Sequence, residues 1–116
     1  MDSDTKQAFV NARAARNRQQ EERRHVIWSA HAVAEMVADR LSRSAVEAAL
    51  TGALVIEDYP TRARPLPDCL LLGHLTDGEP VHAVVAIDLE LDRILIVTVY
   101  RPGPEEWEDD WRTRRK

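Results

Sequence analysis

Histidine, arginine and tyrosine side chains occur in this chain at positions where they could act on a phosphate. His31 and Glu35 are four residues apart, Arg40 follows them, and His82 and Tyr100 lie in two later apolar runs. Histidine changes its charge near neutral pH, and the planar guanidinium of arginine binds phosphate through paired N–H donors. These residue types therefore indicate proton transfer beside a phosphate group.

Arg40 poses a structural question because of where a helix would place it. Ser29 is a favourable N-cap, and the residues from about 30 to 41 favour helix. Arg40 would then project into the apolar stripe that Val33, Met36, Val37 and Leu41 form. In one interpretation it snorkels outward and donates to carbonyls of the last turn. In the other it lines a cleft between helix and sheet and holds a phosphate.

His82 is the second candidate, and its strand is otherwise almost entirely apolar. Such a histidine can be a core group bonded to a backbone carbonyl, or it can be a general acid or base. The Asp77-Gly78 pair predicts a two-residue hairpin turn, which would place His82 opposite Gly73. A glycine there would leave open space above the sheet for a ligand, so we favour the functional reading.

His31 lies on the first turn of its expected helix, where backbone amides disfavour an imidazolium and would keep the ring neutral. The alternative is an exposed histidine that pairs with Glu35. On an ideal helix His31 and Arg40 point in nearly opposite directions, so they share a site only if the helix bends or starts later.

Thr98 and Tyr100 alternate on one face of the last apolar run, and Tyr100 could contact a phosphate or stack on a base. With an even-residue loop at 89–92 they would face away from His82, whereas a one-residue bulge would bring them to its side. The sequence leaves this register open.

Three arginines could form a basic rim for a phosphate backbone: Arg62 and Arg64 in a proline-rich loop, and Arg101 after the last strand. Trp107 and Trp111 are expected to fasten the tail to the core rather than to bind bases. The four histidines and one cysteine show no ligand spacing, so neither a metal site nor a cofactor is expected.

The elements that must position these groups follow from periodicity and from turn residues. Residues 5–24 predict an exposed helix with little apolar face, which would be stable only against a partner or a second copy. A very short strand at 25–28 and two short helices follow, the second capped by Ser42 or by Ser44 with Glu47. The remaining strands are expected at 53–59, 69–75, 81–88 and 93–100.

The predicted fold is therefore α+β, with two short helices on a four-stranded, mainly antiparallel sheet and an extra N-terminal helix. The predicted domain spans 25–107, between a helical extension at 1–24 and a charged tail at 108–116.

Bulk composition fits one globular domain and narrows the function classes. The chain has 116 residues and a net charge of −4, so overall charge does not indicate a nucleic-acid binder. It contains neither a membrane-length apolar run nor the apolar core of a signal peptide. With a single cysteine, Cys69, it is expected to be cytoplasmic.

Several short segments, taken in their order along the chain, resemble the DUF 4258 family, whose members have no known function. The matching pieces span roughly 28–107 and end at Trp107: "SAH", "EM", "DRLS", Gly52, "VIEDYP", "LLLG", "GEPVHAVVA" and "IVTVYRP". The resemblance implies a fold related to RelE-like and MqsR-like endoribonuclease toxins, and a cognate antitoxin with a YgiT-type zinc finger. The family pattern has an arginine at the Arg40 position, which favours a site there, but commonly a glycine where this chain has Leu41.

That resemblance implies a metal-independent endoribonuclease that cleaves single-stranded RNA. His82 would act as base or acid with His31 or Tyr100 as its partner, and Arg40 would stabilise the phosphate. Glu35, Thr98 and the arginine rim would contact substrate. The competing hypothesis is a non-catalytic interaction module that binds another protein, or a second copy through the N-terminal helix.

Overall fold

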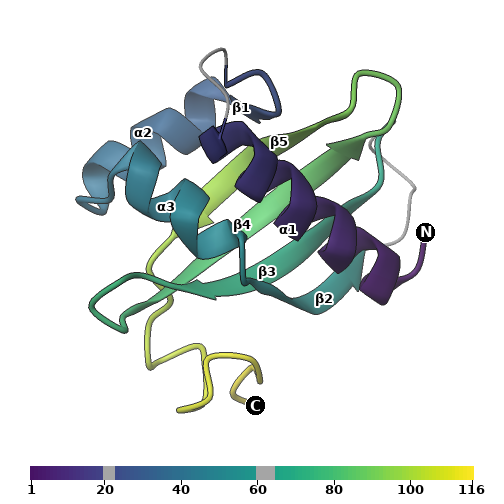
Figure 1. Cartoon of the computed structure of the whole chain (residues 1–116). Coiled ribbons are helices and arrows are strands. Elements are labelled where there is room, and N and C mark those ends of the chain that lie inside the picture. The colour runs from purple at the N-terminus through teal and green to yellow at the C-terminus, as the bar shows by residue number, and fades with distance from the viewer. Residues whose placement is uncertain (20–22, 60–64) are drawn as a thin grey trace.

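The computed structural model describes residues 1–19, 23–59 and 65–116 and has an α+β architecture (Figure 1). Its elements are α1 (Ser3–Gln19), β1 (Val26–Trp28), α2 (Ala30–Ala38), α3 (Arg43–Leu50), β2 (Leu54–Tyr59), β3 (Asp68–His74), β4 (Pro80–Asp88) and β5 (Arg93–Tyr100). Among the described residues, no helix has the length and apolar character that crossing a membrane requires.

The sheet has five strands in the order β1-β5-β4-β3-β2, one more than the sequence predicts. The four later strands form the expected antiparallel meander. The short segment that precedes α2 adds the fifth strand, which runs parallel to β5 and places Val26 beside Ile94. The sheet is therefore mixed but mostly antiparallel.

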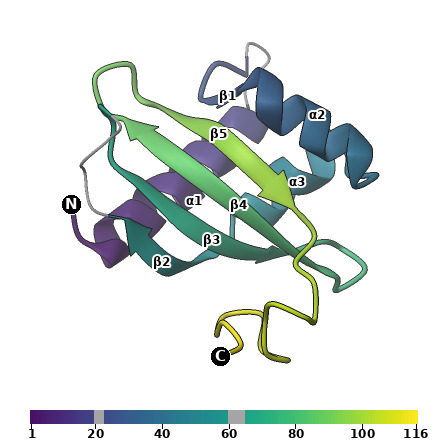
Figure 2. The same ribbon diagram turned by 180° about the vertical axis from the view of Figure 1, so that it is seen from behind.

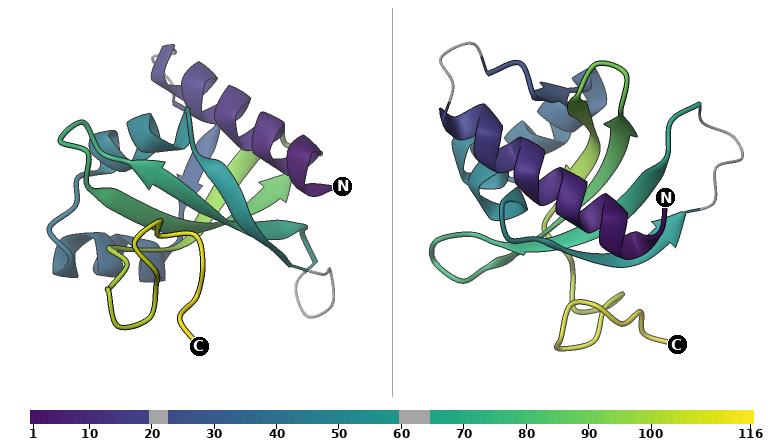
Figure 3. Two further views of the ribbon diagram at one scale, coloured as in Figure 1. Left: turned by 90° about the horizontal axis from the view of Figure 1, so that it is seen from below. Right: turned by 45° about the vertical axis from the view of Figure 1, so that its right-hand side comes forward.

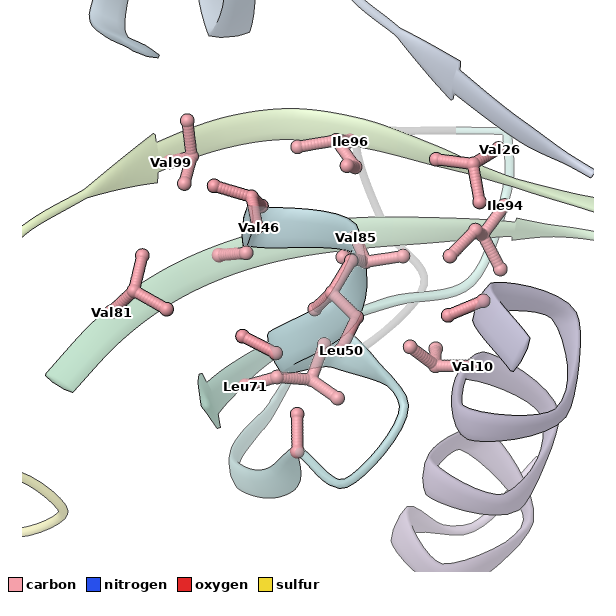
Figure 4. Packing of buried hydrophobic residues seen from close by; sticks show 14 of the residues in the cluster. Val10, Val26, Val46, Leu50, Leu71, Val81, Val85, Ile94, Ile96 and Val99 are labelled. Atoms are coloured by element: carbon pink, nitrogen blue, oxygen red, sulfur yellow. The ribbon is translucent and has the colours of Figure 1, made fainter. Parts of the chain in front are cut away.

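The hydrophobic core lies between the sheet and the helices α1 and α3 (Figure 4). Val10 and Ala14 on α1 are completely buried, as are Val46 on α3 and Val85 on β4. The prediction of an exposed N-terminal helix is therefore wrong, because α1 covers the core of its own chain.

Polar side chains also attach α1 to the rest of the fold, so the helix docks with only a narrow apolar face. The Asn17 side chain accepts from the backbone N–H groups of His25 and Val26 at 3.1 and 3.2 Å and donates to Glu47. Glu47 is buried and also accepts from the Trp28 indole, so it makes no capping box with Ser44. The N-cap of α3 is Ser42 instead.

Helix α2 ends at Ala38, earlier than predicted, and this resolves the position of Arg40. Arg40 adopts the left-handed conformation with φ +54°, while the N–H of Leu41 donates to the carbonyl of Met36. This is the hydrogen-bond pattern of a Schellman C-terminus, a position that glycine usually fills. Leu41 turns into the core and the Arg40 side chain is exposed, so it enters neither the apolar stripe nor the packed core.

The turn between β3 and β4 is one residue longer than the sequence predicts. Gly78 has φ +90° and the N–H of Leu75 bonds to the carbonyl of Glu79, which leaves a three-residue loop. The register shifts accordingly, and His82 pairs with Leu72 rather than with Gly73. A Cβ on Gly73 would meet the backbone of Ala49 on α3 at 3.0 Å, so this glycine admits a helix rather than a ligand.

Strand β5 contains the bulge on which the predicted site depends. Val84 pairs with Thr98 and Val85 pairs with Ile96, which leaves Val97 as the extra residue. The bulge brings Thr98 and Tyr100 to the same face of the sheet as His82, the alternative that the sequence left open.

Candidate functional site

The core of the candidate site is the pair His82 and Tyr100, which face each other across β4 and β5. The Nδ1 atom of His82 lies 3.2 Å from the Tyr100 hydroxyl, and the two rings meet edge to face. Alternation places both residues on the sheet face opposite α1 and α3 (Figure 2). The structure thus brings two of the predicted catalytic candidates into contact.

His82 is completely buried, and both of its ring nitrogens have partners. Nε2 lies 2.7 Å from the carbonyl oxygen of Trp111, which can only accept, so Nε2 carries the proton. Nδ1 therefore accepts from the Tyr100 hydroxyl. Burial lowers the pKa of His82, while the bond to Trp111 and the charge of Glu57 act in the opposite direction. His82 is consequently held neutral.

The segment 102–116 covers the part of this face around His82 and Glu57. Figure 3 shows that this segment and α1 lie on opposite sides of the sheet. Trp107 is 1% exposed, and its ring stands perpendicular to that of His82 with centroids 4.4 Å apart. The expectation that Trp107 fastens the tail is confirmed. The residue on which it rests is the histidine proposed for chemistry.

Arg114 attaches the same segment to β2, the edge strand that β3 separates from β4. Its guanidinium donates to both carboxylate oxygens of Glu57, at 2.6 and 3.0 Å, and lies 4.6 Å from the centroid of Trp107. The paired bond from Arg114 is the main reason that the pKa of Glu57 is lowered. A bidentate arginine–carboxylate pair of this kind fixes the relative orientation of the two side chains, and so the position of the segment on the sheet.

Glu57 and Tyr59 belong to the site, but sequence reasoning did not single them out. The Tyr59 hydroxyl donates to Glu57 at 3.1 Å, and burial together with that bond raises the pKa of Tyr59 to about 12. They occur two residues apart in "VIEDY", the spacing of one strand face. That spacing was the available signal.

A second group of predicted residues lies on the seam between α2 and β5. Glu35 accepts from the Thr98 hydroxyl and, at 3.1 Å, from the backbone N–H of Val99. Exposed His31 lies 3.3 Å from the same carboxylate, as the i, i+4 spacing predicts. This seam therefore brings together three of the predicted residues, His31, Glu35 and Thr98. Thr98 lies two residues before Tyr100 on β5.

Arg101 closes the seam at the end of α2. Its backbone N–H donates to the Asp39 side chain at 2.8 Å, and its guanidinium donates to the carbonyls of Asp39 and Arg40. The capping role that one interpretation gave to Arg40 thus falls to Arg101. Arg40 presents its own guanidinium to solvent beside it.

The remaining predictions concern the rim and metals. Arg62 and Arg64 lie outside the residues that the structure describes. Within the described ranges, no group of three or more histidine, cysteine or acidic side chains could hold a metal ion.

Comparison with known proteins identifies one domain. The model of the family described as "Domain of unknown function (DUF4258)" matches residues 28–101, from the end of β1 through β5. No curated protein and no solved structure matches the chain. The match covers more than half of the chain, leaves α1 outside it and ends at Arg101, short of Trp107, to which the resemblance was expected to extend. The chain therefore belongs to the DUF4258 family, whose function is unknown.

Proposed function

We propose that this chain is the toxin component of a bacterial toxin–antitoxin pair, related in fold to the RelE-like and MqsR-like toxins, and that it cleaves single-stranded RNA without a metal. The observation that carries the proposal is the bulge at Val97, because it sets Tyr100 against His82 and beside the seam that holds His31. An imidazole bonded to the hydroxyl of a half-buried tyrosine can move a proton to or from a bound ligand.

The proposed reaction is an internal attack within the RNA. The ribose 2′-hydroxyl gives its proton to the Tyr100 oxygen, while the proton of Tyr100 passes to Nδ1 of His82. The 2′-oxygen then bonds to the adjacent phosphorus, and the bond from phosphorus to the 5′-oxygen breaks. His31 is the candidate acid that gives a proton to that leaving oxygen, and exposed Arg40 stabilises the negative charge on the phosphate.

The electrostatics around His82 support its part in this scheme. The carboxylate of Glu57 favours the imidazolium that would form. Burial opposes the charge. The proton on His82 would therefore be held only transiently and returned to Tyr100 after the step.

The test is RNA cleavage by the purified chain in the presence of EDTA, with products analysed for 2′,3′-cyclic phosphate ends. Tyr100→Phe, His82→Ala and Arg40→Ala should each lower the cleavage rate about 100-fold or more. Ser44→Ala is the control, because it removes an exposed hydroxyl on α3, on the opposite side of the sheet, and should retain activity. Arg16→Ala, which removes an exposed arginine on α1, is the control for Arg40.

One observation favours a second function, that of a non-catalytic interaction module. His82 is fully buried with both nitrogens bonded, as a purely structural histidine would be. In that case His82→Ala lowers the melting temperature, and wild-type protein leaves RNA intact. Induced expression in bacteria separates the two functions: growth arrest with cleaved RNA supports the toxin, and healthy growth with soluble protein supports the module.

A further inference from the structure

The segment 102–116 is a self-contained loop that rests on the sheet through few contacts. The N–H of Glu108 donates to the carbonyl of Thr113, and the N–H of Arg115 donates to that of Glu106. Arg115 also donates to Glu108 through its side chain. These bonds lie inside the segment, so it can leave the sheet as a unit without losing them.

The contacts to the sheet that anchor this loop converge on one small area. They are the Trp107 ring on His82, the Trp111 carbonyl on Nε2 of His82, and the Arg114 guanidinium on Glu57. The matched family domain ends at residue 101, so the cover is additional to it. Its removal would expose His82, Tyr100, Tyr59 and Glu57.

The chemistry of the cover indicates what it replaces. Five of the six residues from 105 to 110 are acidic, and the sixth is Trp107. A flat aromatic ring flanked by anionic groups has the two features of single-stranded RNA, a base and a charged backbone, and here the ring meets His82 edge to face. The uncovered aromatic rings can take a base, and Glu57 can accept from a base amino group.

We propose that residues 102–116 form a displaceable cover over a single-stranded RNA site, with Trp107 in the place of a nucleobase against His82. This inference rests on the proposed function and names its regulation: RNA and the cover compete for one face of the sheet. The apparent affinity for RNA is then reduced by the fraction of molecules in which the cover is closed.

Arg114→Ala in the full-length chain tests the proposal, because it removes the anchor to Glu57 and leaves the sheet unchanged. The probe is a short fluorescein-labelled RNA with 2′-O-methyl groups, which cannot undergo the attack and so reports binding alone. Arg114→Ala should bind it about tenfold more tightly and show faster hydrogen exchange across 102–116. Arg112→Ala is the control, since it removes the same charge from the same segment and should do neither.

The predicted increase in RNA affinity of Arg114→Ala is opposite to the effect of charge alone, because loss of an arginine by itself weakens RNA binding. A second measurement uses the wild type, in which saturating probe should speed exchange in 102–116. The proposal is overturned if Arg114→Ala loosens the segment without tighter binding, or if exchange stays unchanged in both experiments. Cleavage of unmodified RNA is scored separately, so an active but ungated enzyme and an RNA binder without activity are distinguished.

Discussion

Gly73 gives the sharpest test of how the sheet and α3 fit together, and we predict that Gly73→Ala destabilises the fold. An added Cβ would lie 3.0 Å from the Ala49 carbonyl oxygen and 3.1 Å from its Cβ, so the backbone of α3 must shift. Overpacking of this kind costs about 1–3 kcal/mol. For a domain of this size, that corresponds to a fall in melting temperature of roughly 4 °C or more.

Urea unfolding followed by circular dichroism measures this effect, and Gly52→Ala is the control. Nothing lies within 4 Å of a Cβ at Gly52, so that substitution should leave stability unchanged or raise it by about 0.4–1 kcal/mol. If Gly73→Ala unfolds within about 0.5 kcal/mol of the wild type, the packing explanation fails. A loss of RNA binding with full stability would restore the view that Gly73 leaves room for a ligand.

Three further predictions concern buried polar groups. Asn17→Ala should lower the unfolding free energy by about 3 kcal/mol or more, because two backbone N–H groups and the Glu47 carboxylate lose a buried partner; urea titration measures it. His82 titrates among Glu57, Tyr100 and Arg114, and burial lowers its pKa. The contribution of neutral His82 to the free energy of unfolding is therefore complete above about pH 6.5, and it is lost as the pH falls through the lowered pKa of the folded state. Tryptophan fluorescence should therefore report release of Trp107 in acid, whereas a signal constant with pH would contradict that linkage. Burial raises the pKa of Cys69 to about 12, so its thiol should react with Ellman's reagent only after unfolding.

The four later strands and their antiparallel order could be predicted from sequence, because alternation and continuous apolar runs report burial directly, whereas the pairing of β1 with β5 was not predicted. The exact pairing could not, because it depends on single residues. One extra residue in the turn at Gly78 moves His82 from Gly73 to Leu72, and one bulged residue, Val97, decides which face Tyr100 joins. Alternation of apolar and polar residues specifies neither the length of the turn nor the position of the bulge.

The docking of α1 and of the C-terminal segment was beyond sequence reasoning for a different physical reason. Both depend on polar and aromatic side chains whose partners lie far away in the chain, such as Lys6 on Asp58 and Arg114 on Glu57, and α1 adds only a few apolar contacts such as those of Val10 and Ala14. The hydrophobic period of a segment carries no signal for such contacts. Arg40 was misplaced because the end of α2 uses an arginine in a conformation that usually indicates glycine.

The carboxylates of α2 have a consequence for how any partner protein can bind. Glu35 and Asp39 accept from the N–H groups of Val99 and Arg101, because four residues of helix and two of strand advance by nearly the same distance. These side chains occupy the stretch of the β5 edge that extends beyond β1. A partner that binds by adding a strand there must first displace α2, so any protein partner at this edge is expected to recognise side-chain surfaces.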